Sequence, residues 1–313
     1  RSGGAERAPA QESRKASMKT RTMLPALLVL AALGLTGCVN NAANEAGSPN
    51  ITEGPAVQVD AAAEALLPAD IRDRGVLVLG VNPSYSPNEF KDADGNPTGW
   101  TIQLTDAVAA KLGLESEWRQ AKFDSLIPSI TGGKMDVGAS SFTDNAERQK
   151  VVDFVNYYTA GVQWAAPAGK TVDPDNACGL KVAVQSGTFE HTDEVPAKSD
   201  ACVASGKDAI QILPFDSQED ASNAVALGKA DALSADSPVT LYAIKKMDGK
   251  LVAAGDTFDQ APYGFAIAKG SDLVPAIQAA VQSLIDDGTY LDILTEWGVE
   301  GGAIETATLN AGQ

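Results

Sequence analysis

The sequence predicts an α/β protein with a largely parallel sheet, built from two similar units. From about Ile71 onward, short β-branched runs alternate with segments of helical periodicity, and this alternation is typical of parallel strands joined by helices. The order strand, loop, helix, strand occurs twice, each time followed by a polar residue at a strand end. The 313 residues are enough for about two domains of roughly 100 to 200 residues each.

The first unit begins with a buried strand at residues 75–80. Apolar side chains then recur at every fourth position up to Gly113, which predicts an amphipathic helix with glycine as its stop signal. A shorter helix is expected over residues 124–131, before a pair of glycines, and a strand over residues 136–139. The chain thus returns to the sheet directly before a group of hydroxyl side chains.

The second unit repeats this order, with a strand at residues 180–184, a helix at 218–227 and a strand at 231–235. Pro238 suits the first turn of the next helix, because no N–H is needed there, and we expect that helix to end near Lys246. The remaining chain is expected to form a strand at residues 264–268, a helix at 273–286 and a last helix that ends at Trp297.

Charge and chemistry exclude several functional classes. The chain carries 24 basic and 41 acidic side chains, a net charge of −17, and has no basic run that could follow a phosphate backbone. We therefore expect no nucleic-acid partner. The single histidine, His191, has no cysteine or carboxylate at metal-ligand spacing, and no phosphate-binding or nucleophile-elbow motif occurs. The sequence predicts no metal, no cofactor and a surface position for His191.

The N-terminal region resembles an export signal. An apolar run at residues 23–35 follows Lys19 and Arg21. It is shorter than the roughly 20 residues that span a bilayer, as in a secretory signal peptide. It ends in LTGC, which resembles a bacterial lipobox and predicts a lipid anchor on Cys38. The alternative is an uncleaved anchor with an incidental thiol. We expect residues 1–17 to be an upstream extension and residues 18–37 to be the signal peptide.

Residues 38–70 separate this signal from the folded part. They begin with a polar stretch that is low in large apolar side chains, and such a stretch buries too little surface to fold by itself. The prediction is a flexible tether.

Two further cysteines, Cys178 and Cys202, would lie in an oxidising compartment if the chain is exported. Thiols tend to pair there, so a disulfide is the favoured prediction. Such a bond would stabilise the fold by roughly 3 to 4 kcal/mol in the chain-entropy model. The alternative is two buried free thiols.

Polar side chains gather where the first unit ends. Ser141 and Thr143 lie just past the predicted strand, and Asp144 with Glu147 resembles a capping pair for a short helix. Hydroxyl groups, helix-end N–H groups and the guanidinium of Arg148 together suit a carboxylate. The alternative is a surface arginine paired with a nearby carboxylate, and spacing alone leaves the two possibilities even.

Several segments, in order and spacing, carry a family resemblance across residues 75–298. They are GVNPSYSPNEF at 80–90, GNPTGW at 95–100, FDSLIP at 123–128, SSFTDNAERQKVVDF at 140–154, VAVQSGT at 182–188, DALSAD at 231–236, Tyr263 with Gly264, DGTY at 287–290, and Trp297 with Gly298. In this set the sequence resembles the extracellular solute-binding proteins of family 3, the polar amino-acid receptors of ABC importers.

The resemblance implies a two-lobed periplasmic-binding-protein fold of type II, in which a short two-segment hinge joins the lobes. Lobe 1 would comprise residues 71–160 and 262–300, and lobe 2 residues 163–259. The two crossings would lie near residues 160–161 and 260–261, and residues 301–313 would form a C-terminal tail.

The resemblance also implies a ligand site at the strand ends. Ser141, Thr143 and Arg148 would bind the α-carboxylate of an amino acid, helped by the N–H groups of Thr188 and Phe189. The interval between Thr143 and Arg148 is two residues longer than is usual in the family, which displaces the arginine along its helix.

The other end of the implied ligand would contact a second group of residues. Asp236 would accept the α-ammonium, Tyr85 and Phe123 would sandwich the side chain, and Asn82 would contact its polar end. Asn82 stands where relatives that select basic amino acids carry an acid, and Asn88 stands where an aromatic residue is common. These two differences favour an uncharged polar amino acid or a close analogue.

The function implied is that of a monomeric receptor and not an enzyme. It would be exported and held at the outer face of the cell membrane by the lipid on Cys38, and it would deliver its ligand to an ABC permease with its ATPase subunit. One alternative is an enzyme that resembles cyclohexadienyl dehydratases, with a general acid from Glu89, Glu190 or His191. The other is a ligand-sensing input for a membrane receptor.

Overall fold

The structure, a computed structural model, describes residues 57–313. The predicted extension at 1–17, the signal peptide at 18–37, the anchor on Cys38 and the first part of the tether lie outside these residues. Within the described part, no helix is long and apolar enough to cross a membrane.

The described residues form one eight-stranded mixed sheet in the order β4-β1-β5-β10-β6-β9-β7-β8. β1 runs parallel to β4 and β5, and β7 runs parallel to β8 and β9, whereas β10 is antiparallel to β5 and β6. The strands are β1 (Val76–Val81), β4 (Glu115–Gln120), β5 (Val137–Thr143), β6 (Val152–Pro167), β7 (Lys181–Gln185), β8 (Gln211–Phe215), β9 (Ala232–Asp236) and β10 (Leu251–Ala268), with β2 (Phe90–Lys91) and β3 (Pro97–Thr98) paired separately.

Helices cover this sheet where the sequence predicts them, with starts and ends shifted by a few residues, and three more at residues 61–64, 69–74 and 195–204 were not predicted. The α-helices are α1 (Ala61–Glu64), α2 (Ala69–Arg74), α3 (Trp100–Lys111), α4 (Phe123–Thr131), α5 (Val195–Ala204), α6 (Gln218–Ala226), α7 (Ser237–Lys246), α8 (Val274–Asp286) and α9 (Thr289–Trp297). Shorter turns are η1 (Arg148–Lys150), η2 (Pro174–Asn176), η4 (Glu300–Gly302) and a π-helix, η3 (Glu190–Glu194).

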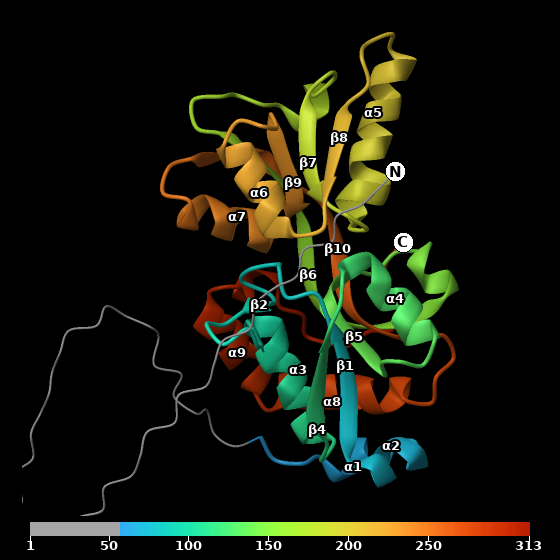
Figure 1. Cartoon of the computed structure of the whole chain (residues 1–313). Coiled ribbons are helices and arrows are strands. Elements are labelled where there is room, and N and C mark those ends of the chain that lie inside the picture. The colour runs from blue at the N-terminus through green and yellow to red at the C-terminus, as the bar shows by residue number, and fades with distance from the viewer. Residues whose placement is uncertain (1–56) are drawn as a thin grey trace, which may run out of the picture. The chain divides into compact units, whose positions relative to one another are not determined.

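Two lobes are visible in Figure 1, and two long strands connect them. Lobe 1 holds β1, β4 and β5 with α1 to α4, α8 and α9, and lobe 2 holds β7 to β9 with α5 to α7. β6 and β10 run through both lobes as an antiparallel pair, and their register shifts between Ala254 and Ala261. This is the two-lobed α/β fold with two connecting segments that the sequence predicts; the residue boundaries given for the lobes stay predictions.

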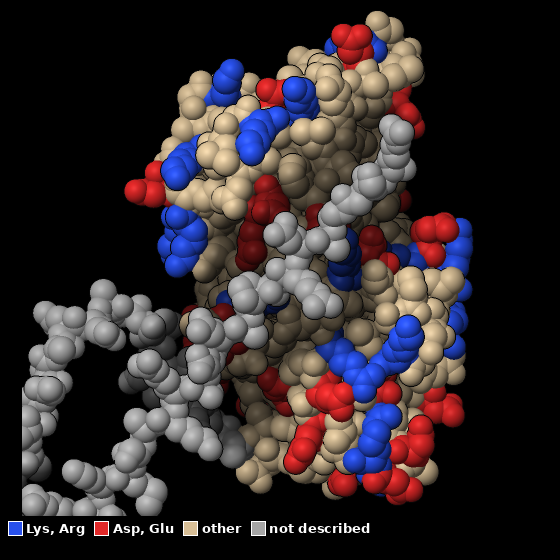
Figure 2. All heavy atoms as spheres, in the orientation of Figure 1, with Lys and Arg blue, Asp and Glu red and all other residues tan. Residues whose placement is uncertain are grey.

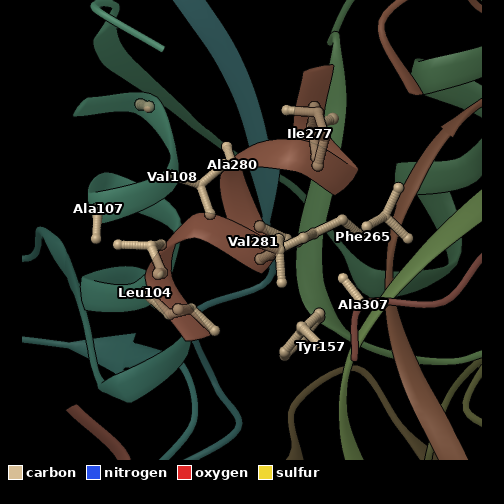
Figure 3. Packing of buried hydrophobic residues seen from close by; sticks show 14 of the residues in the cluster. Leu104, Ala107, Val108, Tyr157, Phe265, Ile277, Ala280, Val281 and Ala307 are labelled. Carbon is tan, nitrogen blue, oxygen red and sulfur yellow. The ribbon is translucent and has the colours of Figure 1, made fainter. Parts of the chain in front are cut away.

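Lobe 1 is built around α3 and α8, which pack on one face of the sheet. Leu104 and Val108 of α3 lie beside Val281 of α8, close to the ring of Phe265 (Figure 3). The rings of Tyr157 and Phe265, from β6 and β10, stack with their centroids 4.2 Å apart. Each such side chain stabilises the fold by roughly 1.5 to 3 kcal/mol when it is fully buried.

Lobe 2 has its own core, and a disulfide lies at its edge. Trp164 of β6, Val182 of β7 and Val195 of α5 are fully buried together. Cys178 and Cys202 form a disulfide with a Cα–Cα distance of 5.5 Å. The bond joins the segment before β7 to α5, as the sequence predicts.

The N-terminal part of the described chain contradicts one prediction. Residues 57–70 belong to the expected tether, yet α1 and the start of α2 pack on lobe 1. Asp60 caps α1, because its side chain accepts hydrogen bonds from the N–H groups of Ala62 and Ala63. Ala63 and Leu67 are buried because the apolar side chains here recur at every fourth position and face the core. The tether prediction is therefore wrong for residues 57–70.

The C-terminal residues are also fastened to lobe 1. Leu309 pairs with Val155 of β6 in an antiparallel bridge. The N–H of Asn156 donates to the carbonyl of Thr308 at 2.8 Å, and the N–H of Asn310 donates to a β6 carbonyl at 3.0 Å. The expected tail at residues 301–313 thus includes a segment that extends the sheet locally.

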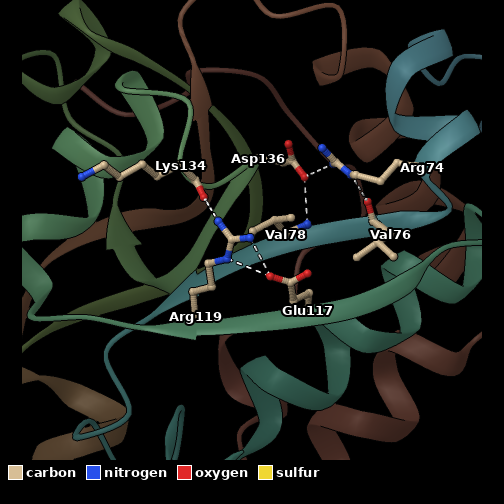
Figure 4. Close-up of polar contacts among 7 residues, drawn as sticks. All are labelled: Arg74, Val76, Val78, Glu117, Arg119, Lys134 and Asp136. Atoms are coloured by element: carbon tan, nitrogen blue, oxygen red, sulfur yellow. Dashed lines mark hydrogen bonds and ion pairs between the residues drawn. The ribbon is translucent and has the colours of Figure 1, made fainter.

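Polar contacts fix the strand starts of lobe 1 at the edge away from the predicted site (Figure 4). The carboxylate of Asp136 accepts the N–H of Val78 at 2.8 Å and pairs with Arg74. The guanidinium of Arg119 donates to Glu117 at 2.6 and 2.8 Å. The Asp136 contact joins β1 to the start of β5, and Arg119 also donates to the carbonyl of Lys134, which joins β4 to the segment before β5.

Candidate functional site

One cavity lies where strands of both lobes end. All nine residues that the resemblance implies line it, together with two that the sequence did not single out, Ser140 and Gln185. The lining residues are Asn82, Tyr85, Phe123, Ser140, Ser141, Thr143, Arg148, Gln185, Thr188, Phe189 and Asp236.

The hydroxyl group of Ser141, on the lobe 1 side of the cavity, is hydrogen-bonded to two buried side chains of lobe 1. Ser141 donates its Oγ hydrogen to Glu89 at 3.0 Å and accepts a hydrogen bond from Asn88 Nδ2 at 3.0 Å. Ser141 also has a left-handed backbone with φ of 48°, which is uncommon for serine. The hydroxyl is therefore already engaged by two side chains of lobe 1.

Glu89 is completely buried behind this turn. Burial raises the pKa of its carboxyl well above the usual range, although hydrogen bonds from Ser141 and Ser140 oppose the rise.

Arg148 reaches the cavity from the segment after β5. Its Nη1 donates to the carbonyl of Thr143 at 2.7 Å, and its Nη2 donates to the carbonyl of Gly187 in lobe 2 at 3.0 Å. The guanidinium carbon lies 5.7 and 5.9 Å from the ring centroids of Phe123 and Phe142. Burial lowers the pKa of this group, and neighbouring acids oppose the change.

The local structure before Arg148 differs from the prediction. The N–H of Arg148 donates to Asn145 Oδ1 at 2.9 Å, so Asn145 and not Asp144 supplies the cap, and the helix is only the short turn η1. Glu147 pairs with Lys150 on the surface. Asp144 cannot cap this turn because its carboxylate is used by other donors. The longer interval is thus a loop that still delivers the arginine to the cavity.

The surface alternative for Arg148 is also tested by these contacts. Neither Glu147 nor Asp153 holds it, because Glu147 pairs with Lys150 and Asp153 pairs with Lys269 at 2.7 Å. The side chain is half-buried and lines the cavity.

Asp236 lies across the cavity at the end of β9, where α7 begins. Tyr85 donates its hydroxyl to Asp236 Oδ2 at 2.7 Å and accepts the N–H of Asp236 at 3.1 Å. Burial raises the pKa of Asp236 from 3.8 to about 6, while the hydrogen bond from Tyr85 and the charge of Arg148 lower it. The carboxylate therefore loses most of its charge below about pH 6.

Asn82 and Gln185 join the two lobes beside the cavity. Asn82 Oδ1 accepts hydrogen bonds from Ser84 Oγ at 2.6 Å and from Gln185 Nε2 at 2.8 Å, and Asn82 Nδ2 donates to a backbone carbonyl. Gln185 is the last residue of β7, whereas Ser140 lies in the middle of β5. The rule that polar side chains at strand ends face the ligand would have found Gln185, had it been applied to every strand.

Gly187 explains why the lobes approach so closely beside Arg148. Its φ is 81°, and a Cβ there would lie 3.0 Å from Cβ of Asp124 in lobe 1. A larger residue would strain the backbone and push against α4.

Comparison with known proteins agrees with this architecture. Residues 77–300 match the bacterial extracellular solute-binding proteins, family 3. The chain belongs to this family.

Members with assigned ligands are similar along most of the chain. An arginine-binding protein of Corynebacterium glutamicum is 42% identical over 289 residues, which cover 90% of this chain and 93% of that protein. Two solved structures of an ancestral arginine-binding protein, one bound to arginine and one to glutamine, have TM-scores of 0.66 and 0.65 at 31% identity. Each match covers 72% of this chain, and it covers 98% of the arginine-bound structure and 99% of the glutamine-bound structure. The fold class predicted from the sequence is confirmed.

The acids considered for an enzyme do not line the cavity of this family 3 protein. Glu190 is buried, with one carboxyl oxygen lacking a hydrogen-bond partner in the described structure, and burial raises its pKa well above the usual range. His191 accepts the N–H of Gly187 at 3.1 Å through Nδ1 and is half-exposed. Glu89 lies behind Ser141. None of the three residues lines the cavity.

Charged side chains of both signs lie on the surface of the described residues. Basic and acidic side chains are interspersed on the face shown in Figure 2. Within residues 57–313, no cluster of three or more histidine, cysteine or acidic side chains could hold a metal ion.

Proposed function

We propose that this family 3 protein is a receptor that binds one amino acid between its lobes. The observation that supports it most is that Arg148 of lobe 1 and Asp236 of lobe 2 line the same cavity. An arginine can grip an α-carboxylate with two parallel hydrogen bonds, and a buried carboxylate can accept an α-ammonium. A zwitterion would therefore contact both lobes.

Such a ligand would stabilise the closed arrangement of the lobes. It interacts with Arg148 and Asp236 together only when the lobes are close, so its affinity for the closed state is higher. Rotation would occur at the β6 and β10 crossings near residues 160–161 and 260–261, with residues 71–160 and 262–300 moving against residues 163–259. The monomeric closed form would then be recognised by an ABC permease with its ATPase subunit.

The proposed ligand has an uncharged polar side chain. Asp236 is the single acid that lines the cavity, and Asn82 offers an amide where a cationic side chain would need a carboxylate. Glu89 and Glu190 do not line the cavity, and burial raises the pKa of both carboxyls. The similar structure bound to glutamine is consistent with such a ligand. Arginine is the second candidate, since the 42% identical relative is an arginine-binding protein.

Isothermal titration of the purified protein with a panel of amino acids tests the receptor proposal. We expect one molecule bound per chain and no chemical change in the ligand. If well-folded protein gives neither heat nor a thermal shift with any amino acid or close analogue, the receptor proposal is wrong.

Selectivity is tested separately by comparing glutamine with arginine on the wild type and on Asn82→Asp. We expect the wild type to prefer glutamine and the variant to gain affinity for arginine, because the new carboxylate supplies a counter-charge. Tighter binding of arginine by the wild type would reject the uncharged ligand and leave the receptor proposal standing.

We also propose that the receptor is lipid-anchored through Cys38 at the outer face of the cell membrane. The support is the lipobox-like LTGC sequence after an apolar run, together with the family's extracellular description. Mass spectrometry of protein isolated from membranes should find a diacylglyceryl group on Cys38 as the new N-terminus. An intact N-terminus with an unmodified Cys38 would contradict the anchor.

A further inference from the structure

The loop that delivers Arg148 is held by residues from the far end of the chain. The carboxylate of Asp144, at the start of this loop, is 1% exposed. It accepts hydrogen bonds from Asn156 Nδ2 at 2.9 Å, from Gln149 Nε2 at 2.7 Å and from the N–H of Gly312 at 2.9 Å. No ion pair to Asp144 is present in the described structure, so these three donors compensate for its burial.

Gln149, at the other end of the loop, is fastened to the same partner. Its Nε2 also donates to the carbonyl of Gly312 at 2.9 Å. Arg148 therefore lies between Asp144 and Gln149, and one residue of the C-terminal segment contacts both.

The C-terminal segment, residues 308–312, is itself anchored on β6. Asn310 Oδ1 accepts the N–H of Phe154 at 2.8 Å, and Asn310 Nδ2 donates to Asp153 at 2.8 Å. The N–H of Ala311 donates to Asn156 Oδ1 at 3.1 Å. We call residues 308–312 the C-terminal brace, because they connect a rigid strand to a loop that otherwise has few partners.

The brace fits closely at Gly312. A Cβ at this position would lie 1.9 Å from the carbonyl oxygen of Asp144. Any larger residue must therefore move the brace away from Asp144 or push the loop itself. At Gly301, by contrast, a Cβ would have no other atom within 4 Å, although this glycine precedes the same C-terminal segment.

We propose that the C-terminal brace positions Arg148 for the ligand, by fixing Asp144 and Gln149 on either side of it. The proposal rests on the proposed function, because it assigns the brace a role in the same site. A fixed loop keeps the guanidinium aimed at the cavity in the absence of ligand, so less ordering is needed when the ligand binds.

The test compares Gly312→Ala with the matched control Gly301→Ala, both in the full chain. We expect Gly312→Ala to weaken binding of the preferred amino acid about tenfold, the effect of roughly one misplaced charged hydrogen bond. Gly301→Ala should bind as the wild type does. Hydrogen exchange should become faster in residues 144–150 of Gly312→Ala and stay unchanged in the control.

A general loss of stability would not depend on Arg148, and a second comparison separates it from positioning. In an Arg148→Ala background, Gly312→Ala should weaken binding by less than about twofold, since there is no guanidinium left to position. In an Asn82→Ala background, which leaves the arginine intact, it should again cost about tenfold. Equal losses in the two backgrounds would overturn the proposal.

Failure of the brace and failure of the receptor proposal give different results. If the wild type binds amino acids and Gly312→Ala binds them like its control, only the brace is rejected. If the wild type binds none, the receptor proposal fails. Hydrogen exchange in residues 144–150 of Gly312→Ala then decides on the brace. Unchanged exchange would reject the brace as well, and faster exchange would mean that it supports the loop but has no role in binding an amino acid.

Discussion

The two lobes share one frame but present opposite charges to the cavity. In lobe 1 the carboxylate of Asp136, at the start of one strand, accepts the N–H of Val78 in its neighbour. In lobe 2 Asp231 accepts the N–H of Lys181 at 2.9 Å in the same way. At the opposite strand ends, lobe 1 supplies Arg148 and lobe 2 supplies Asp236. The acids at the strand starts, Asp136 and Asp231, thus stabilise the sheet, whereas the charged residues at the opposite ends, Arg148 and Asp236, line the cavity.

The lobes also differ in how firmly they hold those charges. Asp236 is part of β9 and is fixed by the sheet and by Tyr85. Arg148 lies outside the strands, on a loop whose ends are fastened to residues distant in sequence. In lobe 2 the position of Asp236 is thus fixed by secondary structure, whereas in lobe 1 the position of Arg148 depends on side-chain contacts.

Removing the charge of lobe 2 should have the largest effect on the site. We expect Asp236→Asn to weaken amino-acid binding by at least about 100-fold, because a buried charged partner of the ammonium is lost. Isothermal titration measures it. Asp231→Asn, at the other end of the same strand, is the control and should lower stability without changing affinity. If Asp236→Asn binds within threefold of the wild type, or Asp231→Asn weakens binding equally, the distinction between frame and site is wrong.

Removing the disulfide should weaken lobe 2 and leave the site alone. We expect the double variant Cys178→Ala, Cys202→Ala to lose about 3 kcal/mol of unfolding free energy, because the unfolded chain gains freedom. Denaturant unfolding gives the free energy, and titration should give an unchanged affinity. A large fall in affinity with stability intact would mean that the bond acts on the site.

A buried acid in lobe 2 should make stability depend on pH. Glu194 accepts hydrogen bonds from Ser234 Oγ at 2.9 Å and Trp164 Nε1 at 3.2 Å, and burial raises its pKa from 4.5 to about 7. Between these two pH values the folded protein holds a proton that the unfolded chain releases, so stability falls as pH rises.

Glu194→Gln keeps the shape and removes this titration. The unfolding free energy of the variant relative to the wild type should increase by about 2 kcal/mol between pH 5 and pH 8. Chemical denaturation at a series of pH values measures the difference, in which other titrating groups cancel. A constant difference across that range would show that Glu194 titrates normally.

The smallest effect that we expect concerns binding and pH. The pKa of Asp236 is about 6 in the protein, and the ammonium of the ligand requires the ionised form. Binding should therefore be about tenfold weaker at pH 5 than at pH 7. Titration with an amino acid whose own side chain does not ionise measures it, and Asp236→Asn should remove the dependence. An affinity that stays constant between pH 7 and pH 5 would contradict this assignment.

Much of the fold could be predicted because its signals are local. Helices such as α4 and α7 follow from periodicity, a proline at the first turn and terminal glycines, and the structure moves their starts by one residue. β6 and β10 were harder, because each is one long strand that crosses between lobes. Their sequences give no local mark of where one lobe stops and the other begins.

The predictions from the sequence were wrong where the local structure depends on contacts with residues far away in the chain. Asp144 and Asn145 are both good capping residues, and the choice between them depends on Gly312, which is 168 positions away. Ala63 and Leu67 lie in a polar context, and their burial depends on the core that α8 helps to build. Ser141, Thr143 and Arg148 were candidates from the sequence alone, whereas the other six site residues came from the family resemblance, which local spacing could not have supplied.

The paired crossing of β6 and β10 has a consequence for the order in which the molecule is made. The chain leaves lobe 1 on β6 and returns on the adjacent strand β10, so lobe 2 is an insertion whose two ends lie side by side. Lobe 1 then still lacks α8, whose Ile277 and Val281 fill its core. During synthesis all residues of lobe 2 are therefore made before lobe 1 is complete. Until α8 is made, the apolar surface that it covers in lobe 1 stays exposed to solvent.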